Sequence, residues 1–186
     1  MTQADSLAGQ FLLALPGMGD PRFDHAVIAM MVHEAEGSLG IGLGRVREGL
    51  ALHSLLEDLE IDPGQAPDCA VLDGGPVEPQ RGFVLHSTDW DGPGTIRAGR
   101  LCALSASLEV LRAIAAGEGP SRFVIALGYA GWSGGQLEGE LHGHGWQVVD
   151  GSEAILFDTL PERRWTACWQ ALGIDPALLA SQTGRA

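Results

Sequence analysis

Short apolar runs separated by turns rich in glycine and proline are the feature that most limits the folds open to this chain. Runs of about four to eight residues between such turns are typical of β-strands. Because glycine alternates with leucine and isoleucine at 38–43, we expect another backbone to approach that strand closely. We predict strands at 10–15, 26–33, 38–43, 69–72, 82–85, 122–129, 146–149 and 154–157, and a strand or hairpin at 95–104.

Apolar side chains also recur at helical spacing, as in the leucines at 52, 55, 56 and 59. Thr159, with Glu162 three residues later, has the pattern of a capping box. Strands early in the chain, followed by mixed strands and helices, favour an α+β fold with a mixed, largely antiparallel sheet and flanking helices. We predict helices at 50–59, from a capping Ser105 or Ser107 through Leu108, Leu111, Ile114 and Ala115, at about 135–142, and from Thr159 to 172.

The length of 186 residues, with 45% hydrophobic and 19% charged residues, fits one compact domain with one core. We expect residues 1–8 to form a disordered tail. Neither a leader sequence nor an apolar run long enough to span a membrane is apparent. The three cysteines, Cys69, Cys102 and Cys168, form no C-x-x-C pair, which indicates reduced, mostly buried thiols. These features predict a cytoplasmic protein without membrane association.

The chain is strongly acidic, with a formal net charge of −13 from 24 acids and 11 bases. All of the bases are arginine. Such a charge repels phosphate backbones, and no basic stripe interrupts it. We therefore expect no direct nucleic-acid binding.

Four motif stretches are found along the chain, at 15–18 with 20–23, 74–77 with 81–87, 128–132 with 135–138, and 157–159 with 161–175. Together they resemble the signature of the bacterial YqgE/AlgH family. The resemblance implies a compact α+β domain in a bacterial cytosolic setting and a link, in one branch, to regulation of alginate production. Family members are often described as transcriptional regulators, but the resemblance implies no reaction.

One departure from the family pattern concerns the segment after the third predicted strand. The family typically has an Asn-Lys-Pro turn there, whereas this chain has Gly44-Arg45-Val46. The positive charge is retained on Arg45, but the amide and the proline are not. A purely electrostatic role can therefore pass to Arg45.

Residues 131–135 fit the pattern G-x-S-x-G between a predicted strand and a predicted helix, where a nucleophile elbow lies in α/β-hydrolases. In that class an acid and then a histidine follow the serine, but here the last histidine is His144 and the first later aspartate is Asp150. The alternative is that the glycines allow a sharp turn, with Ser133 as a cap. Backbone N–H groups at such a turn also favour an anion.

Our leading interpretation is a non-enzymatic regulatory or binding protein that acts through a partner or a small anionic ligand. The alternative is a hydrolase or other enzyme for a phosphorylated or ester substrate, with His86 as acid or base. Against that role, His86 at a strand end can simply make satisfied hydrogen bonds. We expect no metal and no cofactor, and assign no catalytic residue. The candidate ligand-binding residues are Arg45, Gly74, Gly75, His86, Ser87, Tyr129, Gly131, Trp132 and Ser133.

Overall fold

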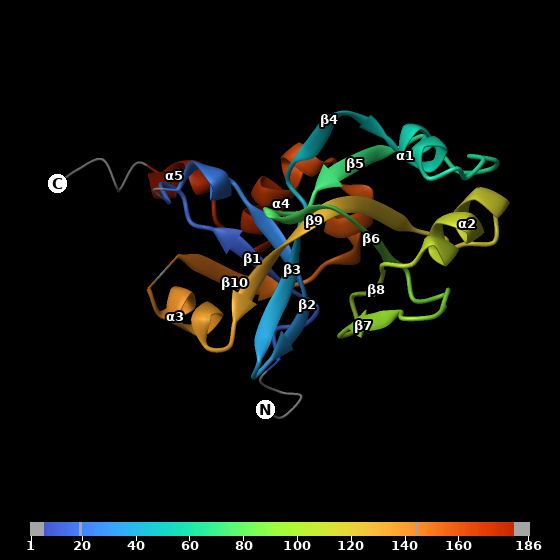
Figure 1. Cartoon of the computed structure of the whole chain (residues 1–186). Helices are drawn as coiled ribbons and strands as arrows, with labels where there is room; N and C mark the ends of the chain where they lie inside the picture. The colour runs from blue at the N-terminus through green and yellow to red at the C-terminus, as the bar shows by residue number, and fades with distance from the viewer. Residues whose placement is uncertain (1–5, 19, 144, 181–186) are drawn as a thin grey trace.

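A computed structural model describes residues 6–18, 20–143 and 145–180, and its ten strands form one strongly curled sheet with several helices (Figure 1). Strand order along the main path is β10-β1-β2-β3-β9-β6-β8-β7, with β4 and β5 attached beside β9. The strands are β1 (Gln10–Ala14), β2 (Val27–Glu34), β3 (Gly37–Gly42), β4 (Val46–Ala51), β5 (Ala70–Asp73), β6 (Val77–His86), β7 (Ile96–Ala98), β8 (Cys102–Ser105), β9 (Phe123–Ser133) and β10 (Trp146–Asp150).

The helical elements are short and lie between the strands or after them. They are η1 (Pro21–Phe23), α1 (Leu52–Asp58), α2 (Leu108–Ala116), α3 (Gln136–His142), η2 (Ala154–Asp158), η3 (Pro161–Arg163), α4 (Arg164–Ala171) and α5 (Pro176–Ala180). The single-domain α+β architecture is as predicted. Within the described residues, no helix is both long enough and apolar enough to cross a lipid bilayer.

β9 is the strand on which both halves of the sheet depend, because it has three partners. Its second half pairs antiparallel with β3, from Gly37 opposite Ser133 to Gly40 opposite Ala130. Its first half pairs antiparallel with β6 and parallel with β5. Where β5 ends, β3 replaces it beside β9.

The backbones cross closely at this exchange of partners. The N–H of Gly74 donates to the carbonyl of Leu127, and the carbonyl of Gly74 accepts from the N–H of Gly42, both at 2.8 Å. A β-carbon on Gly74 would lie 2.3 Å from the carbonyl oxygen of Gly128, so that only glycine fits. Gly75 has φ +149°, in the region of backbone conformation that favours glycine.

Helices cover both faces of β1 and β2, and successive side chains therefore enter different apolar clusters. Phe11 and Leu13 share a cluster with Trp165 of α4. Leu12, between them, shares a cluster with Leu137 of α3. Burial on both faces explains why these strands appear as nearly continuous apolar runs in the sequence.

Arg164 ties α4 to the sheet through a buried guanidinium. Only 3% of this residue is exposed, and its side chain donates to the carbonyl oxygens of Leu43 at 2.7 Å, Leu156 at 2.8 Å and Ile155 at 3.1 Å. Burial lowers the pKa of Arg164 to about 10, which leaves it charged at neutral pH. The neighbouring Trp165 donates from Nε1 to the carbonyl oxygen of Ala14 at 2.9 Å.

Most predicted strands are confirmed to within a few residues, and 95–104 forms the β7–β8 hairpin. The strand predicted at 154–157 is wrong, because this run forms the π-helical turn η2, with Leu156 buried. The predicted capping box is also wrong. Thr159 follows η2 and donates to the carbonyl of Ala154 at 3.1 Å, and the last long helix, α4, begins only at Arg164.

Three further boundaries differ from the predictions. β9 continues through the segment predicted as a glycine-rich turn and ends at Ser133, since β3 pairs with its second half. β4 and α5 were not predicted. Ser107 precedes α2 without a side-chain cap, and Leu108 is 41% exposed, so the buried face of α2 is Val110, Leu111 and Ile114.

The predicted N-terminal tail is described only in part. Residues 1–5 lie outside the described residues. The N–H of Leu7 donates to Nδ1 of His33 at 3.1 Å, and the Leu7 side chain packs on the cluster that contains Leu12.

The backbone crossing predicts opposite effects for two Gly→Ala substitutions. Gly74→Ala places a methyl group against the carbonyl of Gly128, and we expect the free energy of unfolding to fall by about 2 kcal/mol or more. Gly139→Ala meets nothing within 4 Å in the middle of α3, and we expect a gain of about 0.5–1 kcal/mol. Urea denaturation of both variants measures the two values. Equal stabilities would contradict the tight crossing.

Candidate functional site

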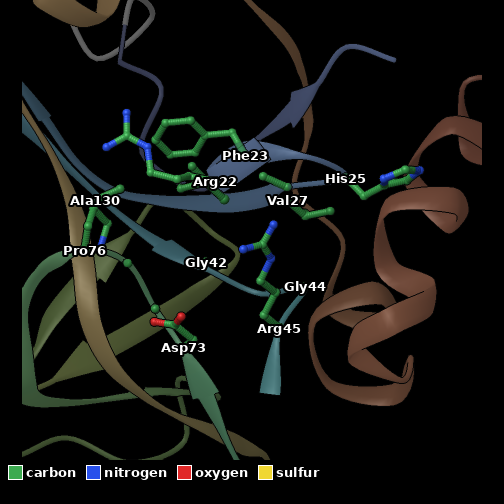
Figure 2. Close-up of a pocket in the computed structure, with 14 residues that line it drawn as sticks. Arg22, Phe23, His25, Val27, Gly42, Gly44, Arg45, Asp73, Pro76 and Ala130 are labelled. Carbon is green, nitrogen blue, oxygen red and sulfur yellow. The ribbon is translucent and has the colours of Figure 1, made fainter. Parts of the chain in front are cut away.

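An open cleft of about 220 Å³ lies at the exchange of partners beside β9. One wall comes from η1 and the start of β2, and the other from the segments that follow β3 and β5 (Figure 2). The floor and walls are mainly apolar, with Phe23, Val27, Ile28, Pro76 and Ala130 among the lining residues. The polar side chains that line it are Arg22, His25, Arg45 and Asp73.

The wall formed by η1 is held by its own acidic residue. The carboxylate of Asp20 accepts from the backbone N–H of Arg22 at 3.0 Å and forms a two-point ion pair with the Arg22 guanidinium, at 2.7 Å for Nη2. Hydrogen bonds from Arg22 lower the pKa of Asp20. Arg22 remains exposed, and its guanidinium lies 5.6 Å from the centre of the Phe23 ring.

Arg45 bridges the two walls from the opposite side. Its Nη2 donates to the carbonyl oxygen of Pro21 at 3.0 Å and lies 3.5 Å from that of Asp24. Among the described residues, no carboxylate pairs with Arg45. Carbonyl oxygens therefore fix the direction of its guanidinium while its charge is left without a counter-ion.

Backbone donors accompany this charge. Gly44 and Gly75 both line the cleft, and within the part of the chain that the structure describes their N–H groups have no acceptor. Neither residue belongs to a strand, so neither N–H is used in a β-ladder. Two N–H donors and a guanidinium together suit an anionic oxygen.

Asp73 supplies the negative charge of the cleft at the end of β5. One carboxylate oxygen lies 3.7 Å from the Arg47 guanidinium, and the side chain is about half exposed. The backbone N–H of Asp73 donates to the carbonyl of Arg45 at 2.9 Å, which joins the two segments. Asp73 can thus accept a hydrogen bond from a hydroxyl or amine of a bound molecule.

His25 lies at the edge of the cleft with its ring directed toward α4 (Figure 2). Its backbone has φ +55°, which is uncommon for a residue other than glycine. The ring stacks edge-on against Trp165 at 4.2 Å between centroids, and its Nδ1 lies 2.9 Å from a carboxylate oxygen of Asp24. These contacts hold the η1 wall against α4.

Of the nine predicted ligand-binding residues, Arg45, Gly74 and Gly75 line this cleft. The four predicted residues on β9 are divided between its two faces, because successive side chains of a strand point to opposite sides of the sheet. Trp132 is buried on the face toward α3, where its Nε1 donates to the Glu140 carboxylate at 3.0 Å. Tyr129, Gly131 and Ser133 lie on the opposite face, and the N–H and hydroxyl of Ser133 are bonded to the amide oxygen of Gln136.

His86 is fully buried and away from the cleft, with both ring nitrogens occupied. Nδ1 lies 2.8 Å from the carbonyl oxygen of Ser87, which can only accept, so the neutral ring carries its proton there. Nε2 then accepts from the hydroxyl of Ser105 at 2.8 Å, and Thr95 bonds to the same hydroxyl at 2.7 Å. Burial lowers the pKa of His86. His86 therefore makes satisfied hydrogen bonds at the end of a strand, which is the second of the two interpretations given for it above.

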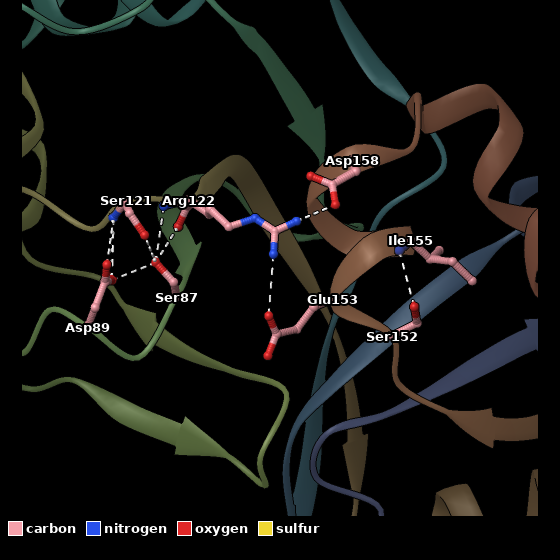
Figure 3. Close-up of polar contacts among 8 residues, drawn as sticks. All are labelled: Ser87, Asp89, Ser121, Arg122, Ser152, Glu153, Ile155 and Asp158. Carbon is pink, nitrogen blue, oxygen red and sulfur yellow. Dashed lines mark hydrogen bonds and ion pairs between the residues drawn. The ribbon is translucent and has the colours of Figure 1, made fainter.

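Ser87 belongs to a polar network at the exposed ends of β6 and β9 (Figure 3). Its hydroxyl donates to the Asp89 carboxylate at 2.6 Å and accepts from the Arg122 N–H at 3.1 Å. The Arg122 side chain extends from there to Glu153 and Asp158. The network joins loops to one another, and a carboxylate alone is a weak base for activating the serine.

The structure does not bring His86 and Ser133 together. His86 pairs with Phe123 at the start of β9, and Ser133 is the last residue of that strand. Ten residues at about 3.3 Å each separate the two levels by roughly 30 Å. The structure therefore separates His86 from the glycine-rich turn near Ser133, and the two do not share one site.

Four cleft residues with functional side chains, Arg22, Phe23, His25 and Asp73, are not among the predicted ligand-binding residues. Asp20-Pro21-Arg22-Phe23 had been noted only as a family motif, and that motif was the available signal.

Among the described residues, no group of three or more His, Cys, Asp or Glu side chains is arranged to hold a metal ion. All three cysteines are free, and Cys102 and Cys168 are buried as predicted.

Comparisons with known proteins were made on the whole chain. The family model described as AlgH-like (DUF179) matches residues 11–177. A UPF0301 protein of Novosphingobium aromaticivorans is 66% identical over 186 residues and covers 100% of both chains. The solution structure of AlgH from Pseudomonas aeruginosa is similar, with a TM-score of 0.81 and 40% identity over 100% of this chain and 99% of that one. DIP2367 from Corynebacterium diphtheriae, 19% identical with a TM-score of 0.73 over 92% and 90%, shares the fold alone.

The buried, neutral His86 predicts a specific dependence of stability on pH. Its folded-state pKa lies below the unfolded value of about 6.5, so the unfolded chain takes up the proton first as the pH falls. The stabilisation is complete well above that pH and is lost as the pH falls through the folded-state pKa. In urea denaturation we expect His86→Gln to lose less free energy of unfolding between pH 7.5 and 5.5 than the parent protein. The same loss as in an exposed His142→Gln control would contradict this.

Proposed function

This chain belongs to the AlgH-like family, as its sequence motifs suggested, and we propose that it binds a small anionic ligand in the cleft between η1 and the segment after β3. The observation that carries the proposal is Arg45. Its guanidinium is oriented by the carbonyl of Pro21, lines the cleft, and has no carboxylate partner among the described residues. In a chain with a net charge of −13 and 11 bases, acids are abundant enough to pair with arginines.

The chemistry of the walls limits the class of ligand. Apolar side chains such as Phe23, Val27 and Ile28 favour a molecule with a compact apolar or aromatic body. Arg45 and the N–H groups of Gly44 and Gly75 favour a carboxylate or phosphate group on it. A volume of about 220 Å³ is below the usual range for drug-sized ligands, about 300–1,000 Å³, so the molecule is small.

We assign no reaction to the cleft, so the role that we propose for ligand binding is regulatory. The acidic chain disfavours contact with DNA, so we propose that ligand occupancy acts through a protein partner. The free cysteines fit a reducing compartment, and we propose the cytoplasm as the setting.

Titration with small aromatic anions tests the proposal. Phenyl phosphate and benzoate, followed by NMR of backbone amides, are expected to shift Gly44 and Gly75 together in at least one titration. Arg45→Met is expected to weaken that binding by about tenfold or more, because it removes a charge-assisted hydrogen bond of about 1.5–3 kcal/mol. Arg45→Lys is expected to retain part of the affinity.

The matched control is Arg81→Met, which removes an exposed arginine that pairs with Glu78 on β6. We expect it to leave anion affinity unchanged. Thermal unfolding of all variants confirms that the fold is retained. Equal losses for Arg45→Met and Arg81→Met, or shifts confined to other surfaces, would refute the cleft as the site.

A further inference from the structure

A second, apolar groove of about 120 Å³ runs between α1 and α2 over the outer face of β6 and β9. Leu55 and Leu59 line it on the α1 side, and Leu108 and Leu111 on the α2 side. Val84 and Leu127 of the sheet form part of its floor. In Figure 1, α1 and α2 lie together at one end of the molecule, away from β1 and α3. The groove shares no lining residue with the cleft that contains Arg45, which we call the arginine cleft.

Both sides of the groove carry a large apolar side chain that is exposed to solvent. Leu59 is 38% exposed and Leu108 is 41% exposed, one on each helix, and both are among the few large apolar side chains left in solvent. The hydroxyl of Ser107 is buried in the groove wall, and the described residues offer it no hydrogen-bond partner. A bound segment would cover the exposed leucines on both sides of the groove.

The shape of the groove suits a helix. Two helices on a sheet leave a channel into which the apolar stripe of a third helix can pack, a common mode of peptide recognition. α2 has nine residues and is about 13 Å long, so an occupant lying along it would make two to three turns of contact.

Charge decides between the possible occupants. The α1 side carries three exposed acids, Glu57, Asp58 and Glu60, beside Leu55 and Leu59. The α2 side carries one acid, Glu109, and one base, Arg112. A second copy of this chain would bring another net charge of −13 and is disfavoured by repulsion. A basic segment matches the acidic rim.

We infer that this groove binds a basic amphipathic helix of a partner protein, with leucine-like side chains between α1 and α2 and lysine or arginine toward α1. The inference does not depend on the arginine cleft. It gives the chain an interaction surface that shares no lining residue with its candidate ligand site.

A designed peptide series on the full chain tests the inference. The probe is a helical peptide of about 20 residues, long enough to form a helix alone, with leucine at i, i+3, i+4 and i+7 and lysine on the flanks. Two matched peptides replace all lysines by glutamate or all leucines by serine. We expect micromolar binding of the first by fluorescence anisotropy, weakening with salt, and at least tenfold weaker binding of the other two.

Variants of the protein then locate the site. Leu59→Asn and Leu108→Asn are each expected to weaken binding about tenfold, whereas Leu160→Asn, which is 56% exposed elsewhere, leaves it unchanged. The double variant Glu57→Gln/Glu60→Gln is expected to weaken binding about fivefold. Its control, the double variant Glu34→Gln/Glu36→Gln, removes the same charge from another surface and is expected to leave binding unchanged.

Several outcomes would overturn the inference. These are no binding of the basic peptide, equal binding of the acidic peptide, equal effects of the paired charge variants, or loss of affinity in Leu160→Asn. Sedimentation that shows a dimer broken by Leu59→Asn would assign the groove to a second copy instead. Because the probe carries no anion for the arginine cleft, its failure leaves the Arg45 experiments unaffected.

Discussion

The close crossing of backbones at Gly74, Gly75 and Gly128 is the constraint on which the structure depends. β9 pairs first with β5 and then with β3 along the same edge, because the pairing with β5 ends at Leu127 and the pairing with β3 begins at Ala130, three residues further along β9. The contacts leave no room for a side chain at Gly74 or Gly75. Elsewhere a glycine in a sheet weakens it, but at this crossing the missing side chain is what permits the pairing.

The arginine cleft is a consequence of the same crossing. Strands β3 and β5 end beside β9 at Gly42 and Asp73, and the chain segments that follow them diverge. The opening between them is filled by η1 only in part. α4 fixes both walls, because Arg164 bonds to the carbonyl of Leu43 and Trp165 packs against His25. A buried guanidinium without a carboxylate is costly, and three carbonyl acceptors offset that cost.

Local pattern was sufficient for much of the fold and failed where pairing or packing decided the outcome. β1 and β2 are long apolar runs, and their assignment needs no tertiary information. Residues 154–157 are equally apolar, but burial of Leu156 beneath α4 favours a helical turn, and a short apolar run cannot distinguish the two. β4 was missed because none of its residues is buried, which leaves no alternation of buried and exposed side chains to detect.

The sequence predicts only those residues of the candidate site that can be recognised one at a time, without knowing which residues the fold brings together. Arg45 was found because it replaces a family lysine, and Gly74 and Gly75 because their turn needs glycine. Arg22 and Phe23 were not, since their proximity to Arg45 arises from a fold that spans more than twenty residues of sequence. His86 and Trp132 have side chains typical of functional sites, but burial and satisfied hydrogen bonds assign them to packing.

The composition of the cleft also bears on whether it binds or transforms its ligand. Among the described residues that line it, Asp73 and His25 carry the side chains that can act as a nucleophile or a base. The carboxylate of Asp73 lies 3.7 Å from the Arg47 guanidinium, and the ring of His25 is held by Asp24 and Trp165. An oriented cation, two free N–H donors and apolar walls are sufficient for selective binding, and binding is therefore the function that this geometry supports best.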